Sequence, residues 1–180
     1  QRRDLYLTGK TLLGAMPPKG QELEKHYFGS ISQRVNDYME EGNKELWNLG
    51  VYAKAEHNEV APGQFEISPI FSSLNVAIDQ NMMMMDILQK VALKHDLVCL
   101  LHEKPFEGVN GSGKHNNYSL VTDDGQNLFD PGKDPHNNVR FLLFTGAILK
   151  AIDDNATLIR LASSDAGNDF RLGANEAPPA

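Results

Sequence analysis

Residues Lys54 to Glu66 read KAEHNEVAPGQFE and place a turn-forming Pro-Gly pair midway between two carboxylates. If Pro62 and Gly63 are the two loop residues of a hairpin, Glu59 lies directly opposite Glu66. Directly opposed side chains have Cβ atoms about 4.5–5.5 Å apart, and like charges at that spacing destabilise a sheet. The pair therefore needs a shared proton, a nearby Arg or Lys, or a divalent cation with hard oxygen ligands.

The proline affects how this hairpin is built. A tight hairpin favours a positive φ at its first central residue, which Pro62 cannot adopt, so we expect the strands to splay at the turn. Even then the carboxylates of Glu59 and Glu66 stay near each other. His57 shares a face with Glu59 if residues 51–60 are extended with a period of two. The pattern alone leaves two interpretations open, a cation site and a surface hairpin with solvated acids.

The composition is that of an ordinary globular domain. The chain has 180 residues, of which 41% are hydrophobic and 23% are charged, and this length suits one domain. The formal net charge of −7 lacks the basic footprint that binding to a phosphate backbone requires, so we expect no nucleic-acid partner. We expect no membrane span either, because charged and polar residues interrupt the longest mainly apolar stretch, residues 82–101.

The single cysteine bears on the compartment. Cys99 has no second cysteine with which to form an intramolecular disulfide, which is typical of a reducing compartment and predicts a cytoplasmic protein. The chain begins at Gln1 without a methionine and stops at Ala-Pro-Pro-Ala, just after a charged, Gly-rich run. We therefore expect residues 1–180 to be part of one domain, truncated at both ends, of a longer polypeptide.

Periodicity predicts helices between short extended segments. The spacing of apolar residues predicts helices over 31–49, 75–94, 138–153 and 156–162, and it predicts strands at 5–7, on both sides of the Pro-Gly turn, at 98–101 and at 117–122. Gly50 supplies a stop for the first long helix. The four methionines at 82–85 suit core or subunit packing. This irregular order, with a hairpin, favours an α+β fold over a doubly wound parallel sheet.

A second motif lies in a Gly-rich loop. Residues Gly108 to Lys114 read GVNGSGK, which has the spacing of a phosphate-binding loop, G-x-x-x-x-G-K. The match fails at the next residue, because His115 stands where a Ser or Thr hydroxyl should reach Mg²⁺ and a strand follows where a helix is required. Glycines on both sides of Ser112 indicate a tight bend or a close approach to a ligand. His115, at the exit of this polar loop, is a candidate metal ligand.

With these residues in view, the chain resembles the glutamine synthetase family, and most closely its long type III form. Residues 59–66 are similar to the family's E-V-x-P-x-Q-x-E segment, and residues 104–119 are similar to its K-P-x(4)-N-G-S-G-x-H-x-N-x-S segment. Residues 168–172 resemble its arginine motif, and the segments at 7–12 and 17–23 resemble the type III branch. The resemblance implies the curved, mostly antiparallel sheet with flanking helices of that catalytic domain.

The resemblance also implies roles for individual residues. It implies that Glu59 and Glu66 bind one divalent ion and that His115 binds a second. Mg²⁺ or Mn²⁺ is the implied cofactor, with two or more ions in each site. Asn110 and Gly111 match the loop that contacts the substrate glutamate.

Four further positions follow from the same motifs. Asn117 and Ser119 fall where the family approaches ATP. Arg171 matches the arginine that interacts with substrate and with the developing phosphate charge. Glu176 matches the glutamate that binds and deprotonates ammonium, although it lies five residues after the arginine and the family's usual spacing is six.

The resemblance also implies a reaction of two steps and an assembly of several subunits. ATP phosphorylates the side-chain carboxylate of glutamate, and ammonia attacks the γ-glutamyl phosphate to give glutamine. The implied assembly is a ring-shaped homo-oligomer of identical subunits. The family also needs an E-x-E pair and an R-x-R-I-E type segment, which these 180 residues lack, so we predict that they make no glutamine by themselves. Two alternatives are a γ-glutamyl ligase that uses a polyamine or another amine, and a non-catalytic scaffold.

Overall fold

The computed structural model describes residues 3–8, 27–165, 167–173, 175 and 176. The elements, in chain order, are α1 (Arg3–Thr8), α2 (Gln33–Asn48), β1 (Ala53–Asn58), β2 (Phe65–Pro69), α3 (Leu74–Lys94), the 3₁₀ turn η2 (Pro135–Asn137), α4 (Val139–Asp154), α5 (Ala156–Ser163) and the 3₁₀ turn η3 (Asn168–Phe170). The predicted α+β class is confirmed. The strand predicted at 5–7 is wrong, because these residues belong to α1.

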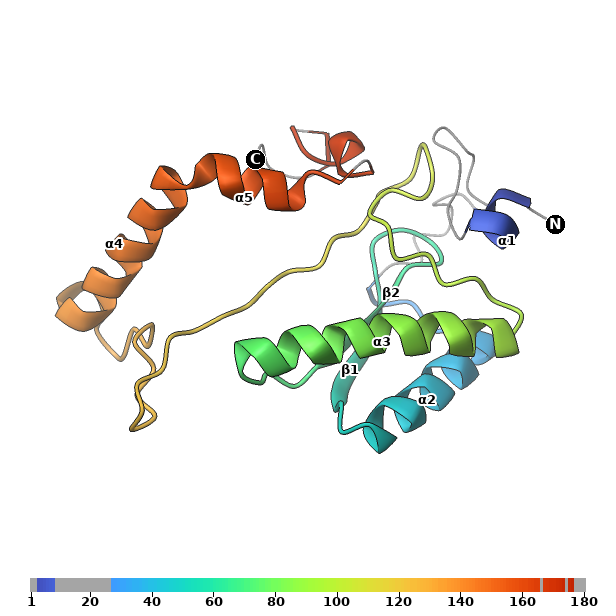
Figure 1. Cartoon of the computed structure of the whole chain (residues 1–180), viewed down its shortest axis with the longest axis horizontal. Helices are drawn as coiled ribbons and strands as arrows, with labels where there is room; N and C mark the ends of the chain where they lie inside the picture. Colours follow the sequence, from blue (N-terminus) through green and yellow to red (C-terminus); the bar gives the residue numbers. More distant parts are fainter. Residues whose placement is uncertain (1–2, 9–26, 166, 174, 177–180) are drawn as a thin grey trace.

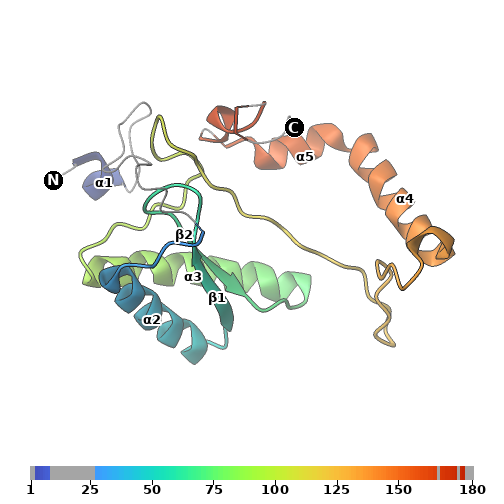
Figure 2. The same cartoon turned by 180° about the vertical axis from the view of Figure 1, so that it is seen from behind.

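One compact unit is built from α2, α3 and the β1–β2 hairpin. Helix α3 passes in front of the strands in Figure 1 and behind them in the reverse view of Figure 2, so it covers one face of the hairpin. The core of this unit contains Leu46 of α2, Met84 of α3 and Val51, which lies between α2 and β1. Ile67 of β2 packs against them. Met84 confirms that the methionine run contributes to the core, while its neighbours Met82, Met83 and Met85 are exposed.

Helix α2 ends as its sequence predicts. Gly50 has a φ of +78°, and its backbone N–H donates to the carbonyl of Trp47, while Val51 N–H donates to the carbonyl of Leu46. These bonds satisfy carbonyls that the last turn of a helix leaves free, and glycine adopts this left-handed conformation without a Cβ penalty. The chain therefore turns sharply from α2 into β1, which brings Val51 into the core.

The hairpin register differs from the expected one. The turn is closed by Gln64 N–H donating to the carbonyl of Ala61, with Pro62 and Gly63 (φ +76°) as its central residues. This is the signature of a type II turn, which does not match the twist of two flanking strands. The antiparallel ladder starts only at Asn58 and Phe65, so six residues form the loop.

This register overturns the expected pairing of the two glutamates. The residue opposite Glu66 is His57, and Glu59 lies just beyond the end of β1. The backbone N–H of Glu59 donates to the carbonyl of Gln64, which closes the base of the loop. The expectation that His57 shares a face with Glu59 is confirmed, because their side chains are in contact.

The chain beyond α3 contains little regular structure before α4. The strands predicted at 98–101 and 117–122 are wrong: residues 98–101 form no ladder, and Val121 makes only an isolated bridge to Asn127. A strand requires a hydrogen-bonding neighbour along its length. Residues 115–134 cross to the far side of the molecule as an irregular, largely extended segment (Figures 1 and 2).

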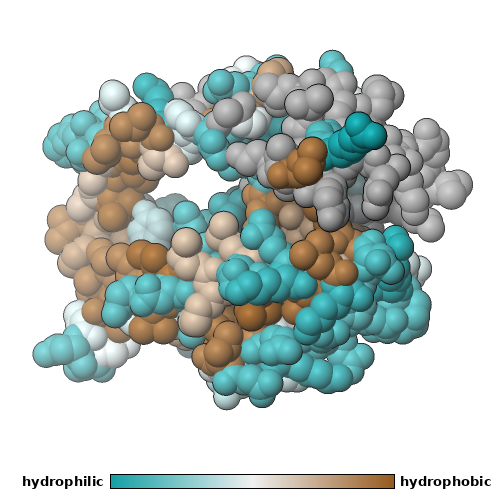
Figure 3. All heavy atoms as spheres, turned by 45° about the vertical axis from the view of Figure 1, so that its right-hand side comes forward, coloured by the Kyte–Doolittle hydropathy of each residue, from teal (hydrophilic) through white to brown (hydrophobic). Residues whose placement is uncertain are grey.

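Helices α4 and α5 confirm the periodicity of the sequence but bury none of their residues. Asn138 caps α4 by accepting a hydrogen bond from Phe141 N–H through its side chain, at 3.1 Å. Apolar side chains on these helices are exposed, including Val139, Leu143, Leu149, Leu158 and Leu161. Brown, apolar atoms reach the surface in several patches of the face drawn in Figure 3. Among the described helices, none is both long and apolar enough to span a membrane.

Candidate metal centre and glycine-rich loop

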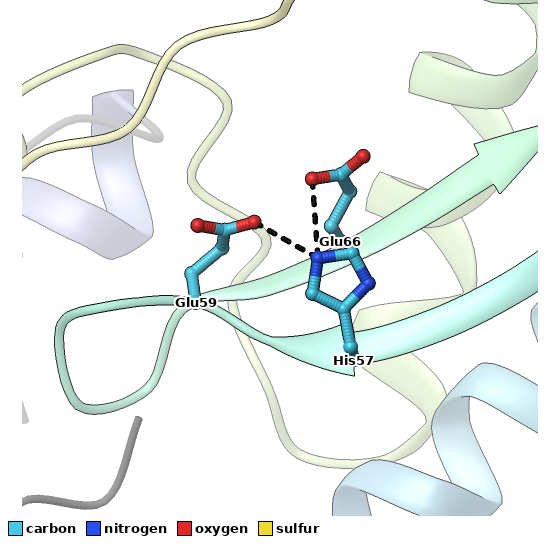
Figure 4. Close-up of side chains that lie close together, drawn as sticks. All are labelled: His57, Glu59 and Glu66. Atoms are coloured by element: carbon cyan, nitrogen blue, oxygen red, sulfur yellow. Dashed lines mark ion pairs between the residues drawn. The ribbon is translucent and has the colours of Figure 1, made fainter. Parts of the chain in front are cut away.

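Three side chains meet at the turn end of the hairpin. In Figure 4 the imidazole of His57 rises from β1 between the carboxylates of Glu59 and Glu66, and His57 Nε2 lies 3.2 Å from Glu59 Oε1 and 3.4 Å from Glu66 Oε2. The three potential ligand atoms all lie within 4.8 Å of one another. We call His57, Glu59 and Glu66 the hairpin cluster.

Burial and hydrogen bonds affect the two carboxylates differently. Partial burial, followed by the interaction with Glu66, raises the pKa of Glu59. The hydrogen bond that Ser68 Oγ donates to Glu66 at 2.8 Å, followed by the bond shared with Glu59, lowers the pKa of Glu66. One carboxylate of a close pair thus holds its proton more strongly and the other less strongly, as expected for like charges that share a site. Both would be deprotonated together most readily with a cation between them.

The cluster has a further neighbour that the sequence did not indicate. The ring of Tyr27 lies 6.1 Å from the ring of His57, measured between centroids, and the Tyr27 hydroxyl hydrogen-bonds to Glu59. The negative charge of Glu59 raises the pKa of Tyr27. The segment that carries Tyr27 is held to β1, because Asn58 Nδ2 donates to the carbonyl of Gly29. Tyr27 therefore covers one side of the hairpin cluster.

The donor set fits a divalent cation. Two carboxylates and one imidazole suit Mn²⁺, and the carboxylates alone suit Mg²⁺, which prefers oxygen ligands. His57 was noted from the period-two spacing but was not predicted as a ligand. The predicted ligand His115 is exposed and lies outside the hairpin cluster, although its charge contributes to lowering the pKa of Glu66. The role of His115 at a second ion stays a prediction.

The Gly-rich loop is tied to the rest of the molecule at several points. Gln64 Nε2 at the hairpin tip donates to the carbonyl of Asn110 at 2.7 Å, so the two motifs are in direct contact. Ser112 N–H donates to the carbonyl of Glu103 at 2.9 Å, and Lys114 Nζ donates to Asn81 of α3. Asn110 is thereby held beside the hairpin turn.

Gly111 has no room for a side chain. A Cβ at this position would lie 2.3 Å from the carbonyl oxygen of Glu103 and 2.7 Å from Cδ of Arg171. The Arg171 side chain also lies across Gly113, and its Nη1 donates to Asn168 Oδ1 at 2.9 Å. The glycines therefore allow the arginine segment to pack directly on the loop backbone. The spacing of the glycines predicted a tight bend or a close approach to a ligand, and the approaching group in the structure is the Arg171 side chain.

The side chain of Glu176 contacts the same loop. Its Oε2 accepts a hydrogen bond from Gly111 N–H at 2.8 Å and lies 3.8 Å from Arg171 Nε, and its Oε1 accepts a hydrogen bond from Lys104. The structure thus brings together three predicted site residues, Gly111, Arg171 and Glu176, with Asn110 next to them in the chain. Asn117 and Ser119 are exposed on the segment that follows the loop.

Several polar atoms around this loop are buried without a hydrogen bond in the described part of the chain. They are Gln64 Oε1, Glu103 Oε2 and Arg171 Nε. A buried polar atom without a partner costs about 1–3 kcal/mol, and such atoms mark places where a ligand or water binds. The amide oxygen of Gln64 and the carboxylate oxygen of Glu103 can accept hydrogen bonds, and the guanidinium of Arg171 can donate one. Together they suit a ligand that carries both amino and carboxylate groups.

The fold and the site together define a class of protein: an α+β domain in which a candidate divalent-cation site adjoins a Gly-rich loop with a half-buried arginine. Comparison with known sequences identifies the family. The sequence model of the glutamine synthetase catalytic domain matches residues 10–161. The chain therefore belongs to the glutamine synthetase family.

Individual relatives support this assignment over the whole chain. The chain is 57% identical to a glutamine synthetase of Butyrivibrio fibrisolvens over 100% of its length, and 58% identical to a type-3 glutamine synthetase of Dictyostelium discoideum over 99%. A glutamine synthetase of Bacteroides fragilis is 54% identical over 99% of the chain. The chain spans 26%, 24% and 25% of these three relatives, so it corresponds to about a quarter of their length.

Proposed function

We propose that the full-length protein containing this chain is a glutamate–ammonia ligase, which forms glutamine from glutamate, ammonium and ATP through a γ-glutamyl phosphate. The observation that carries the proposal is the hairpin cluster, in a chain that belongs to the glutamine synthetase family and whose curated relatives bear that name. Phosphoryl transfer of this kind is catalysed mainly by positioning and by neutralising charge.

We propose that Glu59 and Glu66 bind Mg²⁺ or Mn²⁺, with the His57 imidazole as an additional ligand, and that His115 binds a second ion. A bound divalent ion neutralises charge that develops on phosphate oxygens. The chain's own contribution is to hold both carboxylates and one imidazole together at the turn end of the β1–β2 hairpin. The opposite pKa shifts of the two glutamates support this role, since a cation favours the deprotonated form of both.

The Gly-rich loop is the proposed site for the amino acid substrate. Asn110 and Gly111 contact glutamate, and the planar guanidinium of Arg171 holds a carboxylate or phosphate group. Glu176 attracts ammonium and accepts its proton. Asn117 and Ser119 lie near ATP in this proposal. Gln64 Oε1, which is buried without a hydrogen bond in the described part of the chain, supports a polar ligand at the same place.

The test uses the full-length protein. Glutamine and ADP are measured with glutamate, ATP, ammonium and Mn²⁺ or Mg²⁺, in the wild type and in Glu59→Gln, with Glu40→Gln as a matched control on the exposed face of α2. We expect equal amounts of glutamine and ADP from the wild type and the control and a loss of at least about a hundredfold in Glu59→Gln. A wild type that binds Mn²⁺ but makes no glutamine would contradict the proposal.

Two alternatives are separated by the same assay. The spacing between Arg171 and Glu176 is one residue shorter than is usual in the family, so larger amines are tested as acceptors as well. A polyamine that is consumed faster than ammonium would identify a γ-glutamyl ligase that uses another amine. A non-catalytic scaffold would neither consume ATP nor bind Mn²⁺. The intact set of Glu59, Glu66, His115 and Arg171 argues against the scaffold.

The remaining proposals concern the whole protein. Residues 1–180 are part of one catalytic domain, and the isolated 180 residues make no glutamine. The proposal that further parts of the polypeptide or an identical subunit cover α4 and α5 is supported by the exposed apolar side chains of these helices and by the fourfold greater length of the relatives. We further propose that the protein forms a ring-shaped homo-oligomer and that it is located in the cytoplasm. The single cysteine supports the location, because it suits a reducing compartment.

A further inference from the structure

Lys104 connects the Gly-rich loop to a segment 72 residues away in sequence. Its Nζ donates one hydrogen bond to the carbonyl of Val109 at 2.5 Å and another to Oε1 of Glu176. The second oxygen of Glu176 accepts from the backbone N–H of Gly111 at 2.8 Å. Both carboxylate oxygens of Glu176 are therefore held by donors on or beside one loop.

The two side chains of this connection are partly buried. The side chains of Lys104 and Glu176 are only 13% and 18% exposed, and Val109 is buried. Burial disfavours an ammonium group and lowers the pKa of Lys104, so the carbonyl and the carboxylate offset the loss of water around it. A charge-assisted hydrogen bond in such a place is strong and fixes the geometry of both partners.

Arg171 does not replace Lys104 in this arrangement. The guanidinium Nε is 3.8 Å from Glu176 Oε2, which is an ion-pair distance and not a hydrogen bond. Its Nη1 already donates to Asn168 within the same segment. Without Lys104, the carboxylate of Glu176 would keep the backbone bond from Gly111 and lose its charged hydrogen-bond donor.

We propose that Lys104 is a positioning residue, which holds Glu176 against the loop 108–113 and thereby sets where this carboxylate meets the second substrate. The inference rests on the proposed function, in which Glu176 binds ammonium. Lys104 contacts neither reacting group; it acts through the position of Glu176. Loss of the lysine leaves the Glu176 carboxylate held through one oxygen only, so that it attracts ammonium in unproductive as well as productive places.

The experiment compares Lys104→Met, Lys104→Arg and the control Lys44→Met in the full-length protein. Lys44 carries an exposed ion pair with Glu40 on α2, away from the loop. KM for ammonium and for ATP, kcat, and hydrogen exchange of peptides covering 104–113 and 168–176 are measured. Lys104→Gln, which keeps a donor without the charge, gives the same comparison if the Met variant does not fold.

We expect Lys104→Met to raise KM for ammonium about tenfold or more, to leave KM for ATP within about twofold, and to speed exchange in both peptides. Lys104→Arg recovers most of the loss, and Lys44→Met changes nothing. An unchanged KM for ammonium overturns the proposal even if exchange is faster. A lower KM also overturns it, because Lys104 would then compete with ammonium for Glu176.

The design separates this inference from the proposed function. If the wild type makes no glutamine, the proposed function has failed, and hydrogen exchange alone then decides whether Lys104 holds the two segments together. Faster exchange in Lys104→Met and not in Lys44→Met supports that contact, and equal exchange overturns it.

Discussion

His57 faces Glu66 directly across the β1–β2 ladder, and its Nε2 lies 3.4 Å from the nearer carboxylate oxygen. Because Glu59 follows His57 by two residues, its carboxylate reaches the same nitrogen from the other side, at 3.2 Å. The pairing of His57 with Glu66 thus places one imidazole nitrogen between two carboxylates. The arrangement depends on the type II turn at Pro62. Strand pairing starts at Asn58 and Phe65, three positions before Ala61 on β1 and one position after Gln64 on β2, where a two-residue loop would start it.

The first prediction concerns His57 as a ligand. In the full-length protein we expect His57→Gln to weaken Mn²⁺ binding at least about tenfold and to weaken Mg²⁺ binding less, because Mg²⁺ prefers oxygen ligands and Mn²⁺ accepts imidazole. Titration with each metal by calorimetry measures both affinities. Equal loss for the two metals would indicate that the imidazole only orients the carboxylates.

The second prediction concerns pH and stability without metal. The folded-state pKa of Glu59 is raised, so this group contributes stability below its unfolded pKa of about 4.5 that is lost as pH rises through the folded value. The pKa of Glu66 is lowered, so its contribution is present above that pH and is lost as pH falls. In EDTA at pH 7, Glu59→Gln should raise the free energy of unfolding by up to about 1 kcal/mol, and Glu66→Gln should lower it.

Thermal unfolding of the two variants in EDTA, between pH 4 and pH 7, measures this contrast. The gain in Glu59→Gln should vanish as pH falls toward 4, where the native carboxyl is already protonated. Added Mn²⁺ should reverse the order at neutral pH, because binding to the native state stabilises the wild type by mass action and the variant less. A lower Tm for Glu59→Gln in EDTA at pH 7 would contradict the assignment of the raised pKa to Glu59.

The sequence predicted local structure better than long-range contacts. The helices over 31–49 and 75–94 follow from apolar periodicity and from the stop at Gly50, and both agree with α2 and α3 within two residues at each end. The strands at 98–101 and 117–122 failed because a strand depends on a partner elsewhere in the chain, which a local pattern does not contain. Short apolar runs therefore carried little information about the sheet.

In the candidate site too, the sequence predicted local features and missed contacts between distant residues. The proximity of Glu59 and Glu66 followed from the Pro-Gly turn, but their register did not, since the turn type decides it. Tyr27 gave no signal, and Lys104 was indicated only as the first residue of the Gly-rich motif, because each reaches its partner across 32 or more residues of chain. The spacing of glycines in the loop indicated a close approach, although only the structure identifies Arg171 as the group that approaches.

The third prediction concerns Gly111. A methyl group here would lie 2.3 Å from the Glu103 carbonyl oxygen, so Gly111→Ala must displace the loop or break the bond from Ser112 N–H to that carbonyl. We expect at least about a hundredfold loss of kcat/KM for glutamate in the full-length protein, since a displacement of about 1 Å has that effect on a positioned substrate.

The matched control is Gly146→Ala in α4, where a Cβ meets nothing within 4 Å in the described chain. In a helix interior, alanine is favoured over glycine by about 1 kcal/mol, so this variant of the isolated 180 residues should be equally or more stable, whereas Gly111→Ala should be less stable. Near-normal activity of Gly111→Ala, together with unchanged metal binding, would show that the loop tolerates a side chain and that the backbone approach is not required.

The fourth prediction concerns the exposed apolar side chains of α4 and α5. Leu143 is 65% exposed and Leu158 is 66% exposed, and neither helix buries a residue in this chain. Apolar surface on this scale marks an interface. If other parts of the polypeptide or a second subunit cover these helices, the same substitution should have opposite effects in the short chain and in the full-length protein.

We therefore expect Leu143→Ser and Leu158→Ser to increase the solubility of the isolated 180 residues and to destabilise the full-length protein by about 2–4 kcal/mol each, because a buried leucine loses its packing and a hydroxyl is buried in its place. Light scattering of the short chain and thermal unfolding of the full-length protein measure the two effects. Leu46→Ser, in the core between α2 and the hairpin, is the control and should destabilise both forms. Equal stability of the full-length variants and the wild type would mean that α4 and α5 remain exposed in the assembled protein, and that their apolar faces serve a partner outside it.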